Sequence, residues 1–217
     1  AGQLRLSGDP YFMHPTSVAK TLAEMGFDEH TVAAGLLHDT VEDTSASIEE
    51  LDAEFGEQVA DIVDGVTKIS LMTFDTKEEA QAENIRKMIL AMSHDIRVPI
   101  VKLADRQHNM RTLEFQKPHK QQAIARETMD IYAPLANRLG LHRIKQELED
   151  LSFRYLKPDV YAHITHWLEE NQMVERQLIS KVITQLEAIM KSNGITGRVF
   201  GRIKQTYSIY RKMQQQG

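Results

Sequence analysis

Positions 36–44 carry the sequence Leu-Leu-His-Asp-Thr-Val-Glu-Asp-Thr, in which two apolar residues lead into four ionisable ones. Side chains three and four positions apart share one face of a helix, so Glu42 lies over His38 and Asp39. Asp43 lies over Asp39 in the same way. Three carboxylates and an imidazole with no cation among them repel one another, and a divalent cation removes that repulsion. The stretch predicts a metal site on a helix, although a solvated acidic helix face has the same pattern.

Two distant segments supply further groups of the same kind. His14 precedes a proline at the start of the first long helical pattern. Asp105, His108, Asn109 and Thr112 follow at i, i+3, i+4 and i+7, which makes a polar stripe on a helix with an apolar entry. Such a stripe indicates the wall of a cleft. A simple turn at His14 and a buried polar network around Asp105 remain the alternatives.

The composition restricts which metal chemistry is open to the chain. It has 217 residues, 26 Lys+Arg against 31 Asp+Glu, nine histidines and no cysteine. The absence of cysteine excludes disulfides and thiolate sites, so a transition-metal site must use imidazole and carboxylate. A mixed set of His14, His38, Asp39 and Asp105 suits Mn, Fe, Mg or Zn. The net charge of −5 argues against a nucleic-acid binder with a basic surface, and no apolar run predicts a membrane span.

The hydrophobic periodicity is helical along most of the chain, which predicts an all-α body. Interruptions are expected at a loop over 70–78, at Pro134, and at 157–158. One strand is expected over 195–203, followed by a short helix. The expected helices cover 15–25, 28–43, 47–55, 59–66, 79–94, 97–113, 118–133 and 142–191.

These motifs resemble those of known families. The pattern of His14, His38-Asp39 and Asp105 is similar to the HD superfamily of metal-dependent phosphohydrolases, which are helical bundles. Longer motifs at positions 5–15, 38–44 and 101–113 resemble the RelA/SpoT family of stringent-response enzymes, and the likeness continues through 82–88 and 125–140. The intact His-Asp motif favours the SpoT-like branch that hydrolyses guanosine tetra- and pentaphosphate.

The resemblance implies an enzyme, a guanosine-3′,5′-bis(diphosphate) 3′-pyrophosphohydrolase in the cytoplasm, that converts (p)ppGpp and water to GDP or GTP and pyrophosphate, with Mn²⁺ as cofactor. It implies that the four residues named above bind the metal, and that Glu42 and Asp43 position and activate the attacking water. The implied contacts to the guanosine nucleotide come from Arg5, Ser7, Tyr11, Asn109 and Thr112. No nucleic acid or membrane partner is expected. An HD phosphohydrolase for another nucleotide and a non-catalytic alarmone-sensing module are the rival interpretations.

The C-terminal stretch 201–213 resembles the opening motif of the family's synthetase domain. There, Arg202, Lys204, Ser208 and Lys212 would help to hold ATP phosphates. The chain as given stops before any acidic residues that could bind the Mg²⁺ of a synthetase. We therefore predict an HD hydrolase domain with its connecting helices over 1–190, the truncated beginning of a synthetase domain over 191–217, no synthetase activity, and regulatory domains that lie outside this chain.

Overall fold

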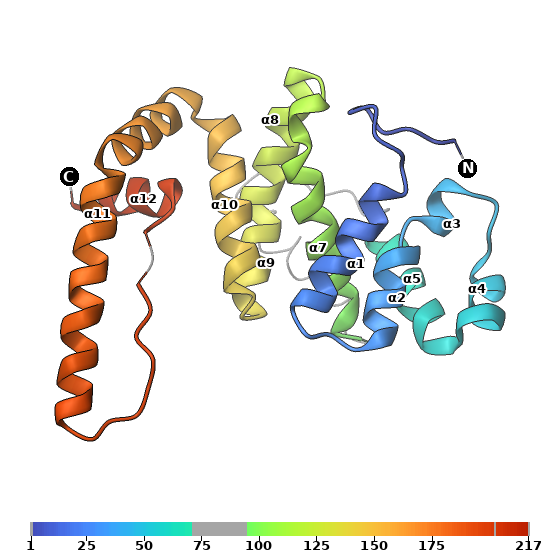
Figure 1. Ribbon diagram of the computed structural model, residues 1–217. Coiled ribbons are helices and arrows are strands. Elements are labelled where there is room, and N and C mark those ends of the chain that lie inside the picture. The colour runs from blue at the N-terminus through green and yellow to red at the C-terminus, as the bar shows by residue number, and fades with distance from the viewer. Residues whose placement is uncertain (1, 71–94, 202, 217) are drawn as a thin grey trace. The chain divides into compact units, whose positions relative to one another are not determined.

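The computed structural model describes residues 2–70, 95–201 and 203–216. The chain divides into two compact units, Ala1–Leu156 and Lys157–Gly217, and every regular element in the described ranges is a helix (Figure 1). The prediction of an all-α body is thus confirmed. The expected loop over 71–78 and the expected helix over 79–94 lie outside the described residues. None of the described helices is long and apolar enough to span a bilayer.

The first half of the larger unit begins its helices where the sequence supplies capping side chains. The Asp28 carboxylate accepts the backbone N–H of Thr31 at 3.0 Å. Ser47 and Glu50 form a reciprocal capping box. Each pair satisfies N–H groups that a helix terminus leaves without partners. The helices of this half are α1 (Met13–Glu24), α2 (Glu29–Leu37), α3 (Thr40–Asp43), α4 (Ile48–Phe55) and α5 (Glu57–Ser70).

The second half of the larger unit continues with α7 (Arg97–Arg111), the 3₁₀ turn η1 (Leu113–Phe115) and α8 (Pro118–Glu127). A wide π-helical turn, η2 (Thr128–Tyr132), then leads into α9 (Ala133–Arg138) and α10 (His142–Leu156). Proline lacks an N–H donor and its ring displaces the carbonyl four residues earlier, which explains a wide turn directly before Pro134. The expected interruption at Pro134 is therefore a π turn, after which the chain remains helical.

Helix α7 is central to the packing of this unit. It contacts α1, α2, α5 and α10, and its apolar residues are almost fully buried. Helices α1 and α2 approach each other closely at Gly35, where an added Cβ would lie 2.5 Å from Leu22 Cδ1. This close approach brings the N-terminus of α1 beside the C-terminus of α2, and both ends face α7 (Figure 1).

Two sequence predictions of secondary structure are wrong. The helix expected over 28–43 ends at Leu37, and a turn at His38 and Asp39 separates it from α3. The strand expected over 195–203 is absent from its described residues, 195–201 and 203. A β-strand requires a neighbouring strand to satisfy its backbone groups, and no other strand is described in the ranges that the structure covers.

The smaller unit consists of α11 (Pro158–Ser192) and α12 (Thr206–Gln216), which contact each other. The interruption expected at 157–158 is confirmed, because α10 ends at Leu156 and α11 begins at Pro158. The short helix expected after residue 203 corresponds to α12. The assignment of 1–190 and 191–217 to a hydrolase and a synthetase domain remains a prediction.

Candidate active site

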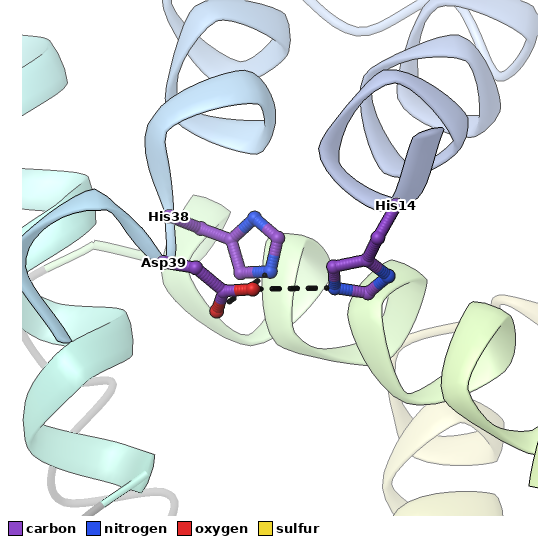
Figure 2. A group of neighbouring side chains, drawn as sticks. All are labelled: His14, His38 and Asp39. Carbon is purple, nitrogen blue, oxygen red and sulfur yellow. Dashed lines mark ion pairs between the residues drawn. The ribbon is translucent and has the colours of Figure 1, made fainter. Parts of the chain in front are cut away.

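Three helix ends and one helix face bring together the four predicted metal ligands. His14 lies in the first turn of α1, His38 and Asp39 form the turn between α2 and α3, and Asp105 lies on α7. The Nε2 atom of His14 lies 3.4 Å from Asp39 Oδ2 and 3.2 Å from Asp105 Oδ1. Figure 2 shows the ring of His14, from the first turn of α1, and the ring of His38, from the turn after α2, facing the Asp39 carboxylate. One ligand atom from each of these three residues lies within 4.8 Å of the others.

His38 presents a buried nitrogen to two carboxylate oxygens. Its Nδ1 donates to the carbonyl of Gly35 at 2.9 Å, so a neutral ring carries its lone pair on Nε2. That Nε2 lies 3.1 Å from Asp39 Oδ1 and 3.7 Å from Asp105 Oδ1, yet it makes no hydrogen bond of good geometry with any described residue. Three acceptor atoms facing one another in a buried site repel, and either a proton or a metal cation removes the conflict.

The protonation preferences of the site follow from this crowding of anions. Burial alone lowers the pKa of His38, but the carboxylates of Asp105 and Asp39 outweigh it, and the pKa is raised. Burial raises the pKa of Asp105, but the ammonium of Lys102 and the two histidines hold it well below its ordinary value. Both shifts indicate that positive charge is stabilised here.

Lys102 and His108 are close to the predicted ligands, and sequence reasoning gave neither of them a role. Lys102 Nζ lies 2.8 Å from Asp105 Oδ2 and donates to Ser70 Oγ at 2.9 Å. His108 Nδ1 lies 2.8 Å from His14 Nδ1. Lys102 precedes Asp105 by three positions on α7, and this i, i+3 spacing is the signal that could have indicated the pair. For His108 the i, i+3 stripe was visible, but its contact with α1 was not.

The two predicted water-activating acids, Glu42 and Asp43, are both exposed on α3 but have different neighbours. Partial burial raises the pKa of Glu42, and the nearby carboxylates of Asp39 and Asp105 raise it further. The ammonium of Lys102 has the opposite effect and lowers this pKa. Asp43 is exposed and its Oδ2 accepts a 2.5 Å hydrogen bond from the Tyr11 hydroxyl. The same hydroxyl lies 2.6 Å from Asp39 Oδ2, so two carboxylates share its single hydrogen. The pKa of Tyr11 is raised by burial and by these two anions.

A cavity of about 700 Å³ opens beside this cluster, and its lining includes His14, Asp39, Glu42 and Asp105. That volume is within the range of small-molecule pockets. Further along the cavity, Arg5 donates to Asn109 Oδ1 at 3.0 Å and to Thr112 Oγ1 at 3.4 Å.

The N-terminal loop carries Arg5 into this position by a turn that closes on Gly8. The Gly8 N–H donates to the Arg5 carbonyl, and the φ of +87° at Gly8 favours glycine. The Ser7 hydroxyl also lines the cavity, but it bonds to the Asp9 carboxylate at 2.8 Å. All five predicted nucleotide-contacting residues thus line one cavity, and the Tyr11 hydroxyl points at the carboxylates of Asp39 and Asp43.

Two arginines near the site have structural partners. Arg106 lies 2.9 Å from Glu127 and its guanidinium stacks 3.9 Å from the centre of the Tyr132 ring. Arg111 pairs with Glu147, which also accepts from Gln107. These contacts connect α7 to α8, η2 and α10.

The candidate ATP motif lies in the smaller unit. Lys204 is exposed ahead of α12, half-buried Ser208 lies in its first turn, and exposed Lys212 lies one turn further on. Arg202 is outside the described residues. The ATP-binding role of this motif remains a prediction.

The fold and the cluster together define a helical protein with a buried His-Asp site. Residues 1–142 match the family model of the HD domain. The GTP pyrophosphokinase of Myxococcus xanthus is 52% identical over 219 residues, which cover all of this chain and 29% of that protein. The bifunctional (p)ppGpp synthase/hydrolase SpoT of Escherichia coli K12 is 50% identical over 212 residues, which cover 98% of this chain and 30% of that protein.

A solved structure of a SpoT ortholog is also similar to this chain. It is described as a metazoan ortholog of SpoT that hydrolyses ppGpp and plays a role in starvation responses. It aligns with a TM-score of 0.50 and 26% identity, covering 70% of this chain and 86% of that one. The chain therefore belongs to the RelA/SpoT family and contains its HD domain. It spans less than a third of the length of the curated relatives above.

Proposed function

We propose that this chain hydrolyses guanosine tetra- and pentaphosphate at the 3′-pyrophosphate, in a reaction that depends on one divalent metal ion, Mn²⁺. The observation that carries the proposal is the buried cluster in which His38 Nε2 faces the oxygens of Asp39 and Asp105. A related E. coli O157:H7 protein, 50% identical over 212 residues, is named guanosine-3′,5′-bis(diphosphate) 3′-pyrophosphohydrolase. That name supports the same reaction for this chain.

The donor set fits a divalent ion. Two imidazole nitrogens and two carboxylates, from His14, His38, Asp39 and Asp105, form a mixed nitrogen and oxygen set that suits Mn²⁺. The carbonyl of Gly35 holds the His38 ring so that Nε2 is available as a ligand. When bound, a divalent ion supplies Lewis acidity that makes water a better nucleophile near neutral pH and offsets charge on phosphoryl oxygens.

Glu42 and Asp43 are the proposed water-activating acids. In the reaction a water oxygen attacks the phosphorus attached to the ribose 3′ oxygen, and the bond between that phosphorus and the 3′ oxygen breaks. Pyrophosphate is released with the water oxygen, and the 3′ oxygen takes up a proton to become the ribose hydroxyl of GDP or GTP. Glu42, in the cavity wall, is placed to accept the proton that the water loses. Asp43 orients the water, and the Tyr11 hydroxyl fixes Asp43 relative to Asp39.

The cavity provides a matching place for the nucleotide. Arg5 is held by Asn109 and Thr112, and a planar guanidinium can stack on guanine or bind phosphate in a bidentate manner. Asn109 also donates to Asp105 at 2.5 Å, so the nucleotide-contacting residues and the metal ligands form one connected network. Ser7 is proposed to add a hydroxyl contact from the N-terminal loop.

The test is an assay of protein stripped with a chelator and then reloaded. We expect no turnover of ppGpp without metal, recovery with Mn²⁺, and release of intact pyrophosphate with GDP. His38→Ala removes a ligand and abolishes turnover, whereas His119→Ala, at an exposed position on α8, retains it. Failure of Mn²⁺ to restore activity, or full activity in His38→Ala, contradicts the proposal.

The same assay separates the rival interpretations. Faster turnover of deoxynucleoside triphosphates or cyclic dinucleotides than of ppGpp favours a phosphohydrolase for another nucleotide. Binding of ppGpp without turnover, whichever metal is supplied, favours a sensing module.

A further inference from the structure

His14 lies between two different kinds of partner. Its Nε2 faces the carboxylates of Asp39 and Asp105, at 3.4 and 3.2 Å. On the opposite side of the ring, its Nδ1 lies 2.8 Å from Nδ1 of His108. The two rings are tilted by 57° with centroids 4.8 Å apart, and His14 is 2% exposed. Both nitrogens of this buried ring therefore have a defined partner.

A contact of 2.8 Å between two ring nitrogens holds one hydrogen, so one ring donates and the other accepts. A neutral imidazole carries its hydrogen on one nitrogen and its lone pair on the other. If His14 offers the Nε2 lone pair to a cation, its Nδ1 must carry the hydrogen. His108 Nδ1 must then be the acceptor, and the hydrogen of His108 must be on Nε2.

We propose that His108 is a positioning residue that sets the tautomer of His14, and that metal binding reverses the hydrogen bond between them. The inference rests on the proposed function only in taking His14 Nε2 as a ligand. Without metal, and at a pH at which both rings are neutral, His14 Nε2–H points at Asp105 and His108 Nδ1–H donates to His14. With metal bound, His14 Nδ1–H donates to His108, and the proton count of the pair is unchanged.

The contrast with His38 explains why a second histidine is suited to this position. The acceptor for His38 is a backbone carbonyl, which cannot donate, so His38 has one neutral tautomer whether or not metal is bound. His108 can both donate and accept. It thus allows His14 to bond to Asp105 without metal and to act as a ligand with it.

The first measurement uses the whole 217-residue chain with ¹⁵N-labelled histidine and Zn²⁺, a diamagnetic probe. Two-bond nitrogen–hydrogen spectra report which ring nitrogen of each histidine carries the hydrogen. We expect His14 Nδ1–H and His108 Nε2–H with Zn²⁺, and His14 Nε2–H with His108 Nδ1–H in the stripped protein. A residue that only filled space beside His14 would not produce this reversal.

The second measurement is Zn²⁺ affinity by competition with a chelating dye. His108→Leu removes the acceptor and should weaken binding about 10- to 100-fold. His108→Asn places an amide oxygen near the position of Nδ1 and should stay within about threefold of wild type. His119→Leu is the matched control at an exposed histidine and should leave the affinity unchanged.

The outcomes separate this inference from the proposed function. Tight Zn²⁺ binding by wild type with the His14 Nδ1–H and His108 Nε2–H pair already present in the stripped protein, or equal affinity in folded His108→Leu, overturns the inference alone. Tight Zn²⁺ binding together with a His14 Nε2–H tautomer also removes His14 from the proposed ligand set. No Zn²⁺ binding by wild type overturns both. If His108→Leu does not fold, the inference is tested by the wild-type tautomers and by the Zn²⁺ affinity of His108→Asn. A tenfold loss of affinity in the asparagine variant also counts against the inference.

Discussion

Replacing Lys102 with methionine tests the electrostatic account of the site. The ammonium lies 2.8 Å from Asp105 Oδ2, and the two side chains are 12% and 5% exposed. Lys→Met keeps an unbranched apolar side chain and removes the ammonium, together with its charge and its hydrogen bond to Ser70. Asp105 would then remain buried and anionic with one less cation, although burial favours its neutral form.

The structure sets the size of the effect. Removing one member of a buried ion pair costs about 3–5 kcal/mol, because the other charge remains desolvated. For a chain of this size each kcal/mol corresponds to roughly 2–4 °C in Tm, so we expect a decrease of roughly 6–20 °C in metal-free protein. Lys145→Met is the matched control, since Lys145 lies 3.2 Å from Glu149 on α10, away from the cavity.

A metal ion should offset part of this loss, since it supplies positive charge to the same carboxylate. Two unit charges about 6 Å apart interact by about 3 kcal/mol at an effective dielectric constant of about 20, so the ammonium and a nearby cation repel appreciably. Mn²⁺ should therefore stabilise Lys102→Met by at least about 1 kcal/mol more than it stabilises wild type.

The assay is urea denaturation followed by circular dichroism, in chelator and in saturating Mn²⁺, on wild type and both variants. Lys145→Met should respond to Mn²⁺ as wild type does. A loss below about 1 kcal/mol in metal-free Lys102→Met would refute the buried-pair argument. An equal or smaller gain from Mn²⁺ than in wild type would refute the argument that ammonium and metal share Asp105.

Three further predictions concern a cap, a bridge and a close helix contact. The Thr31 N–H lowers the pKa of Asp28, so the carboxylate stabilises the fold above its ordinary pKa and this contribution is lost as pH falls through the lowered value. Asp28→Ala should cost about 1 kcal/mol at neutral pH and progressively less in acid; an equal cost at every pH in denaturation curves would contradict this. Tyr11→Phe frees Asp39 and Asp43 and should weaken Mn²⁺ binding about tenfold by calorimetry; unchanged affinity would show that the bridge is dispensable. Gly35→Ala should lower stability by about 1 kcal/mol, because the cost of overpacking against Leu22 exceeds the gain in helix propensity. A variant more stable than wild type would show that helix propensity is the larger of the two effects.

Local signals were sufficient to predict most of the helices. The capping box at Ser47 and Glu50 and the prolines at 118 and 158 act within one turn of the backbone, so they predict helix starts without knowledge of the fold. The break after Leu37 was missed because the apolar pattern continues through it. The strand over 195–203 was wrong because β-propensity has no effect without a partner strand.

In the candidate site, too, local features could be predicted from the sequence and contacts between helices could not. The adjacent His38 and Asp39, with acids one turn on, were sufficient to indicate a metal, because their ligand chemistry is a property of the residues themselves. The contact of His108 with His14 joins α7 to α1, and the Tyr11 hydroxyl joins the segment before α1 to the turn after α2 and to α3. Most helices and the ligand types depend on neighbours along the chain, so they could be predicted without the fold. The contacts between ligands on different helices could not, because those distances depend on how separate helices pack.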